Sequence, residues 1–239
     1  MNGSLVTPEL RARVRGVAVP VALALGRLGL TPNALTVLGF GISVVAAFAA
    51  SQQAWIAAGL LVIFGGVFDL LDGALARATN TVSRLGAFLD SVFDRAGESV
   101  LYLGIATGCF WGGFGEGAVL ATAALAASVM VSYTRAKSES LGFTPGTGMA
   151  NVGLAPREVR LVVLTLGLLF APTPLHESVP VGAACAGVCD FPQGGSLTLT
   201  LSAITILATI TTIQRIVHVT RQTPPESANS ATPGGDQHP

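Results

Sequence analysis

The most informative stretch of this 239-residue chain reads Asp69-Leu-Leu-Asp72-Gly73-Ala-Leu-Ala76-Arg77, then eight residues, then Gly86-Ala-Phe-Leu-Asp90-Ser-Val-Phe-Asp94. It contains four aspartates in two pairs. Asp69 and Asp72 are three positions apart and Asp90 and Asp94 are four apart, so each pair shares one face of a helix. The connection between the two helical segments is short. The spacing therefore predicts two neighbouring helices whose acidic faces meet.

Four carboxylates that converge repel one another unless cations bind between them. Ligation by oxygen alone favours Mg²⁺ or Mn²⁺, with Ca²⁺ as a further option, over zinc. Gly73 and Gly86 carry no side chain, which lets a ligand or a neighbouring helix approach the backbone closely. The alternative is that the aspartates cap helices or pair with nearby arginines. Acids inside apolar segments are costly and usually functional, so we favour a metal site.

Composition defines the environment of these acids. Hydrophobic residues make up 51% of the chain and charged residues 11%, whereas soluble domains carry about 25% charged residues. The formal net charge is zero, which argues against a nucleic-acid-binding protein. The three cysteines, Cys109, Cys185 and Cys189, form no recognisable metal framework. The chain is expected to be a membrane protein.

Apolar segments of nearly membrane-spanning length predict an all-α membrane protein with six transmembrane helices. The expected spans are 34–51, 54–76, 86–109, 116–134, 159–173 and 195–214. Before them, residues 8–28 mix arginines with apolar residues, which is typical of an amphipathic juxtamembrane helix in the interface. We therefore expect an N-terminal cytoplasmic segment over 1–28, a six-helix domain over 29–221 and a disordered tail over 222–239.

The basic residues predict the orientation. With a cytoplasmic N-terminus and six crossings, all 13 Lys and Arg fall on the cytoplasmic side, as the positive-inside rule requires. Both termini and the aspartates would then be cytoplasmic, in a multi-pass protein of the plasma membrane.

The spaced pattern Asp-x2-Asp-Gly-x2-Ala-Arg-x8-Gly-x3-Asp-x3-Asp resembles the signature of the CDP-alcohol phosphotransferase family, and every fixed position matches. The Gly29–Thr36 segment and the six-span organisation extend the resemblance over about residues 10–221. The resemblance implies a homodimer and two Mg²⁺ or Mn²⁺ ions. It also implies site residues: the metal ligands Asp69, Asp72, Asp90 and Asp94, with Asp94 also the catalytic base, and the CDP-lipid-binding residues Gly73, Ala76 and Arg77.

Such an enzyme transfers a lipid phosphate group from a CDP-linked lipid, such as CDP-diacylglycerol, to an alcohol and releases CMP. Metal ions stabilise the charge of the donor's pyrophosphate. A carboxylate is a weak base towards an alcohol, so Asp94 would take the hydroxyl proton in concert with attack.

The acceptor is suggested by five cations expected on the same face: Arg135, Lys137, Arg157, Arg160 and Arg215. Their segments resemble those of phosphatidylinositol phosphate and archaetidylinositol phosphate synthases, which implies inositol 1-phosphate as acceptor. The order of Arg135 and Lys137 is reversed relative to that subgroup, and Ala155-Pro156 alters the later acidic run. Glycerol 3-phosphate is the alternative acceptor. The cations would otherwise be ordinary membrane anchors.

A divalent-cation transporter is the rival interpretation, since intramembrane acids also form ion paths. The aspartates, however, gather at one membrane level, and Gly73, Ala76 and Arg77 have no role in conduction. An inactive structural membrane protein is a third option, which the intact set of four aspartates disfavours.

Overall fold

The structure is a computed structural model that describes residues 8–143, 153–171 and 195–222. Over these residues it is all-helical, as predicted, with seven helices. They are α1 (Pro8–Arg27), α2 (Pro32–Ser51), α3 (Trp55–Ala78), α4 (Arg84–Trp111), α5 (Gly115–Ser140), α6 (Arg157–Phe170) and α7 (Gly195–Gln222). The predicted interfacial helix corresponds to α1. Residues 172–173 of the fifth expected span, tail residues 223–239, Cys185 and Cys189 lie outside the described residues.

Local sequence signals explain where the helices around the aspartates begin. Thr31 caps α2, since its hydroxyl accepts a hydrogen bond from the backbone N–H of Ala34 over 3.2 Å, and Pro32 follows at the first helical position. Ser83 caps α4 in the same way, accepting from the N–H of Gly86 over 3.0 Å. Only residues 79–83 separate α3 from α4. The two acidic segments are therefore joined by a tight turn.

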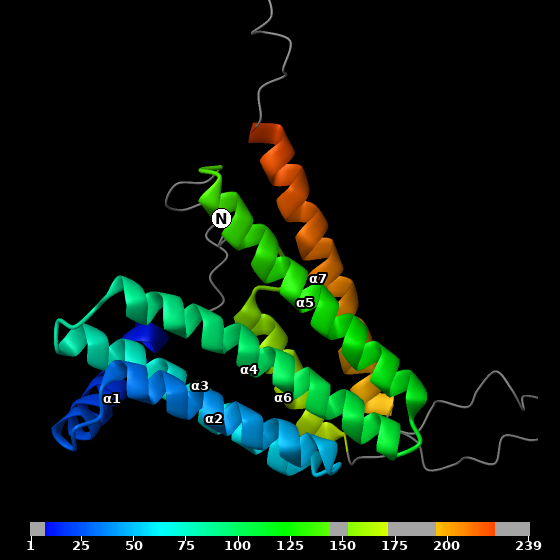
Figure 1. The fold of residues 1–239 in the computed structure, drawn as a ribbon, viewed down its shortest axis with the longest axis horizontal. Coiled ribbons are helices and arrows are strands. Elements are labelled where there is room, and N and C mark those ends of the chain that lie inside the picture. The colour runs from blue at the N-terminus through cyan, green and yellow to red at the C-terminus, as the bar shows by residue number, and fades with distance from the viewer. Residues whose placement is uncertain (1–7, 144–152, 172–194, 223–239) are drawn as a thin grey trace, which may run out of the picture.

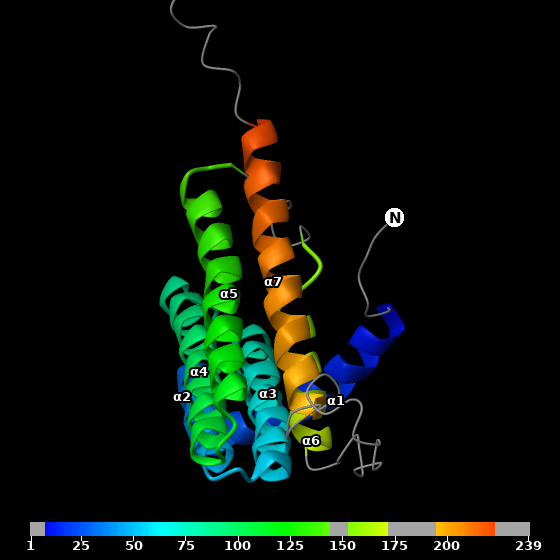
Figure 2. The ribbon, with the colours of Figure 1, turned by 90° about the vertical axis from the view of Figure 1, so that its right-hand side faces the viewer.

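The helices form one bundle (Figures 1 and 2). Helix α2 packs on α3 and α4, α5 packs on α4 and α7, and α6 packs on α3 and α7. Helices α5 and α7 lie side by side and extend past the other helices at one end. Helix α1 is inclined to the bundle and contacts α3. The end of α3 and the starts of α2, α4 and α6 consequently meet in one region.

Small residues bring α4 close to α2. A Cβ atom added to Gly104 would collide with the backbone of Ala47, and one added to Gly108 would collide with the carbonyl of Ala50. Buried alanines dominate the α2 side of this contact. Such close backbone approach is typical of helix pairs in membranes.

Four of the described helices are long and apolar enough to cross a membrane: α2, α3, α5 and α7. Helix α4 has the length, but its N-terminal part, from Arg84 to Glu98, carries five charged residues: Arg84, Asp90, Asp94, Arg95 and Glu98. Helix α6 has 14 residues, about 21 Å at 1.5 Å per residue, which is less than the hydrocarbon thickness of about 30 Å. The described structure thus supports a multi-pass membrane protein.

Candidate active site

Three aspartates form a compact acidic cluster where α3 ends and α4 begins. One carboxylate oxygen from each of Asp69, Asp72 and Asp90 lies within 4.8 Å of the others. Asp72 is buried, Asp90 is partly buried and Asp69 is exposed. Oxygen ligands of Mg²⁺ or Ca²⁺ lie about 2.0–2.6 Å from the metal, so two of them lie at most about 5 Å apart. The cluster fits the predicted cation.

The buried member of this cluster is fixed from a neighbouring helix. The hydroxyl of Thr36 on α2 donates a hydrogen bond to Oδ2 of Asp72 over 2.6 Å. Hydrogen bonds to ligating carboxylates commonly orient metal ligands. The family-like segment at the start of α2 therefore contacts the acidic cluster directly, a contact that sequence reasoning did not identify.

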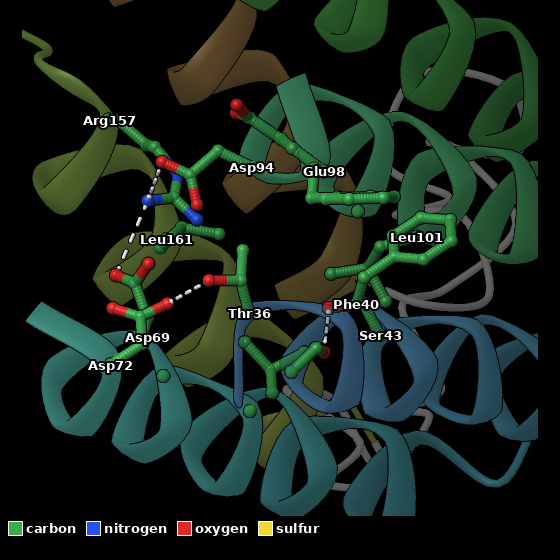
Figure 3. A pocket seen from close by; sticks show the side chains of 16 residues that line it. Thr36, Phe40, Ser43, Asp69, Asp72, Asp94, Glu98, Leu101, Arg157 and Leu161 are labelled. Atoms are coloured by element: carbon green, nitrogen blue, oxygen red, sulfur yellow. Dashed lines mark hydrogen bonds and ion pairs between the residues drawn. The ribbon is translucent and has the colours of Figure 1, made fainter. Parts of the chain in front are cut away.

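The fourth aspartate, Asp94, lies outside this three-carboxylate group and contacts arginines instead (Figure 3). Nη1 of Arg157, from the first turn of α6, lies 2.7 Å from Oδ2 of Asp94 and 3.5 Å from Oδ2 of Asp69. Arg95 lies 3.4 Å from the same Asp94 oxygen. Nε of Arg157 is buried and has no hydrogen-bond partner. Arg157 thus bridges acids from α3 and α4.

A groove of about 490 Å³ opens beside the acidic cluster, within the size range of small-molecule sites. Gly73, Ala76 and Arg77, which the resemblance assigns to the CDP-lipid, all line it, together with Asp72 and Asp90. Space is tight at Gly86 in its wall, because a Cβ there would lie 3.1 Å from Oγ of Ser83 and 3.3 Å from Oδ1 of Asn33.

A smaller cavity of about 80 Å³ lies on the other side of the aspartates. Asp69, Asp94 and Arg157 line its polar end, and Phe40 and Leu101 line its apolar end. Asp72 and Thr36 line both this cavity and the larger groove. The two spaces therefore meet at that hydrogen-bonded pair.

Of the five predicted acceptor cations, Arg157 is the one that forms ion pairs with these aspartates. Arg160 is buried and pairs with Glu98 on α4. Arg215 is also buried, and its guanidinium donates a hydrogen bond to the carbonyl oxygen of Val131 on α5.

The remaining two cations lie near the end of α5. Arg135 forms an ion pair of 2.8 Å with Glu139, four residues further along the same helix, and both side chains are more than 40% exposed. Lys137 is exposed. The structure therefore brings Arg157 to the aspartates and leaves Arg135 and Lys137 at the exposed end of α5.

Sequence reasoning also missed Glu98, which lines the smaller cavity. A signal was present, because Glu98 follows Asp94 by four residues and extends the spacing of Asp90 and Asp94 along one face of α4.

Comparison with known proteins agrees with this arrangement. The sequence model of the CDP-alcohol phosphatidyltransferase family matches residues 29–214. An archaetidylinositol phosphate synthase of Pyrococcus horikoshii is 36% identical over 164 residues, covering 68% of this chain and 81% of the relative. A phosphatidylinositol phosphate synthase of Streptomyces avermitilis is 33% identical over 241 residues, covering 98% of this chain and 90% of the relative.

Solved structures of Mycobacterium tuberculosis phosphatidylinositol phosphate synthase have the same fold. The crystal structure with CDP-DAG bound matches with a TM-score of 0.70 and 27% identity, covering 85% of this chain and 93% of that one. The complex with manganese and citrate matches with a TM-score of 0.68 and 28% identity, covering 84% and 88%. The transporter interpretation is left without support, and the chain belongs to the CDP-alcohol phosphatidyltransferase family.

Proposed function

We propose that this enzyme transfers a phosphatidyl-type group from a CDP-linked lipid, CDP-diacylglycerol or similar, to inositol 1-phosphate and releases CMP. The observation that carries the assignment of a phosphorylated acceptor is Arg157, a cation 2.7 Å from Asp94 in the cavity next to the larger groove. A phosphate on the acceptor would be bound there beside the reacting hydroxyl. Relatives named phosphatidylinositol phosphate synthase support the choice over glycerol 3-phosphate.

The donor would lie in the larger groove. Gly73 and Ala76 leave room for the CDP moiety against α3, and Arg77 offers guanidinium N–H donors to its phosphates. Asp69, Asp72 and Asp90, with Asp94 as a further ligand, would hold Mg²⁺ or Mn²⁺, as two ions. The bound metal would supply charge neutralisation at the donor's pyrophosphate.

Asp94 would act as the base. It would accept the proton of the acceptor hydroxyl while the hydroxyl oxygen bonds to the lipid-side phosphorus and the bond from that phosphorus to the oxygen of CMP breaks. The nearby cations Arg157 and Arg95, whose guanidinium nitrogens lie 2.7 Å and 3.4 Å from Oδ2 of Asp94, would orient its carboxylate for this step.

The acceptor phosphate would be bound by Arg157 in the cavity. The resemblance assigns four further cations to this role: Arg135, Lys137, Arg160 and Arg215. The guanidinium of Arg157 supplies paired N–H donors suited to phosphate oxygens.

Substitution of Arg157 tests this assignment. Arg157→Ala should raise the KM for inositol 1-phosphate by about tenfold or more, since a charge-assisted contact worth about 1.5–3 kcal/mol is lost. The KM for the CDP-lipid should stay within about twofold, and Arg157→Lys should recover only part of the loss. Arg221→Ala, at the far end of α7, controls for membrane anchoring. An unchanged acceptor KM in well-inserted Arg157→Ala protein would refute the assignment.

We also propose that the chain crosses the membrane six times, through the four long apolar helices and through α4 and α6. The six-helix domain would span residues 29–221, between the interfacial segment 1–28 and the tail 222–239. The protein would be a homodimer in the plasma membrane, with both termini cytoplasmic. Single cysteines at the exposed positions Val82 and Ser140, in a cysteine-free background, should be labelled only from the cytoplasmic side, and one at Gly115 only from outside. Reversed labelling would contradict this topology.

A further inference from the structure

We propose that Glu98 is a positioning residue of this reaction: its buried pair with Arg160 holds the start of α6 so that Arg157 faces Asp94 and Asp69. The proposal rests on the proposed function, because it gives Arg157 the acceptor phosphate as its ligand. It also reassigns Arg160 from binding the acceptor to supporting the residue that does.

Both side chains of the Glu98–Arg160 pair are buried. Glu98 is 5% exposed and Arg160 is 1% exposed. Nε of Arg160 donates to Oε1 of Glu98 over 3.0 Å, and Nη2 donates to Oε2 over 2.9 Å. Nη1 donates to the carbonyl oxygen of Ala155 over 3.0 Å. All three guanidinium nitrogens therefore have protein partners, so the group is fixed in orientation.

The pair lies next to the candidate active site in a regular arrangement. Asp94 and Glu98 are four residues apart on α4, and Arg157 and Arg160 are three residues apart on α6, so each pair of side chains lies on one helix face. Two ion pairs consequently join the same two helices, Arg157 to Asp94 and Arg160 to Glu98. Asp94, Arg157 and Glu98 line the cavity, whereas Arg160 lies one turn further along α6 and is buried.

Burial separates the two ion pairs by role. The side chain of Arg157 is 26% exposed, so a ligand can reach part of it. Arg160 is nearly inaccessible, and a buried arginine without its carboxylate would be strongly unfavourable. Its bond to Ala155 also anchors the backbone just before α6 begins. Loss of the Glu98 carboxylate would leave Arg160 buried without its ion-pair partner, and we expect the start of α6 to shift in response and to carry Arg157 with it.

A double-mutant cycle tests the coupling. Glu98→Gln should raise the KM for inositol 1-phosphate by about tenfold while the KM for the CDP-lipid stays within about twofold. In an Arg157→Ala background the same substitution should add less than about twofold, because its effect passes through Arg157. Glu98→Asp, which keeps the charge, should recover part of the loss. Equal effects in both backgrounds, or an unchanged acceptor KM, would overturn the proposal.

Two controls separate positioning from a loss of stability. Ser128→Ala removes a buried hydroxyl that donates to Tyr102 on α4 and should leave both KM values unchanged. The double substitution Glu98→Leu/Arg160→Met replaces the buried pair with apolar side chains, which proteins often tolerate. It should restore thermal stability in detergent yet keep the raised acceptor KM. A normal acceptor KM in the stable double variant would contradict positioning.

A readout without turnover distinguishes failure of this proposal from failure of the proposed function. Arg157 lies 3.5 Å from an Asp69 oxygen, so removing or displacing its positive charge should tighten Mn²⁺ binding to the acidic cluster. Electron paramagnetic resonance of free Mn²⁺ measures this binding. Arg157→Ala and Glu98→Gln should both lower the Mn²⁺ Kd, and the double variant should match Arg157→Ala. If wild type uses another acceptor, only the proposed function fails. If Glu98→Gln leaves the Kd unchanged while Arg157→Ala lowers it, the positioning role fails.

Discussion

The hydroxyl of Thr36 donates a hydrogen bond to Oδ2 of Asp72 over 2.6 Å, although 36 positions separate the two residues in the chain. The bond joins the first turns of α2 to the end of α3. Both residues line the groove assigned to the donor and the cavity that contains Arg157. Under the proposed function, this bonded pair would therefore lie where donor and acceptor meet.

Removal of the Thr36 hydroxyl should weaken metal binding. Thr36→Val keeps the size of the side chain but leaves the buried carboxylate of Asp72 without its donor, so the Mn²⁺ Kd should rise by about 10–100-fold. Electron paramagnetic resonance of free Mn²⁺ measures this without substrate. Thr36→Ser restores a hydroxyl and serves as the matched control. Equal affinity in Thr36→Val and wild type would show that the bond does not orient a metal ligand.

Asp94→Asn should abolish most turnover while CDP-lipid binding persists. The amide cannot accept the hydroxyl proton, and loss of a general base costs typically about 10²–10⁴-fold in rate. The donor groove is lined by Asp72 and Asp90 rather than Asp94, so the Kd for CDP-lipid should change by less than about threefold. The rate of CMP release and equilibrium binding of the CDP-lipid are the two measurements. A near-native rate would mean that Asp94 is not the base.

Gly104→Ala should destabilise the bundle. The added Cβ meets the backbone of Ala47 rather than a movable side chain, so α2 and α4 must separate, at a cost of about 1–3 kcal/mol. Gly41→Ala is the matched control, because a Cβ there meets nothing within 4 Å and alanine favours helix. The midpoint temperature of thermal unfolding in detergent should fall for Gly104→Ala and should stay the same or rise for Gly41→Ala. The reverse order would contradict the close packing of α2 against α4.

Much of the helical architecture was predictable, because the length of the apolar segments and the capping residues are local sequence signals. Thr31-Pro32 and Ser83 mark the starts of α2 and α4 in the sequence itself. The fourth and sixth expected spans end at residues 134 and 214, whereas the helices α5 and α7 continue to Ser140 and Gln222. The apolar segment that crosses the membrane ends where charged residues begin, but the helix itself continues through those charged residues.

The acidic cluster was largely predictable and the arginine contacts were not. Helical spacing alone brings Asp69 to Asp72 and Asp90 to Asp94, and a short turn brings α3 to α4. The partners of Arg157 and Arg160 depend on how α6 packs on α3 and α7, which decides whether its arginines reach the acids of α4, and no local pattern specifies that packing. The sequence does not distinguish the five cations predicted on one face, whereas in the structure Arg160 is buried and Arg157 is partly exposed. The roles of the individual site residues remain predictions.

Product analysis with the wild-type enzyme tests the central claim most directly. Purified protein in lipid vesicles would receive CDP-diacylglycerol, Mg²⁺ and one acceptor at a time: inositol 1-phosphate, glycerol 3-phosphate, free inositol or serine. CMP and the lipid product would both be quantified by mass spectrometry. We predict equimolar CMP and phosphatidylinositol phosphate with inositol 1-phosphate, at a rate at least about tenfold above every other acceptor, and no product with excess EDTA. Faster transfer to glycerol 3-phosphate or to an acceptor without phosphate, or undiminished transfer in EDTA, would contradict the account.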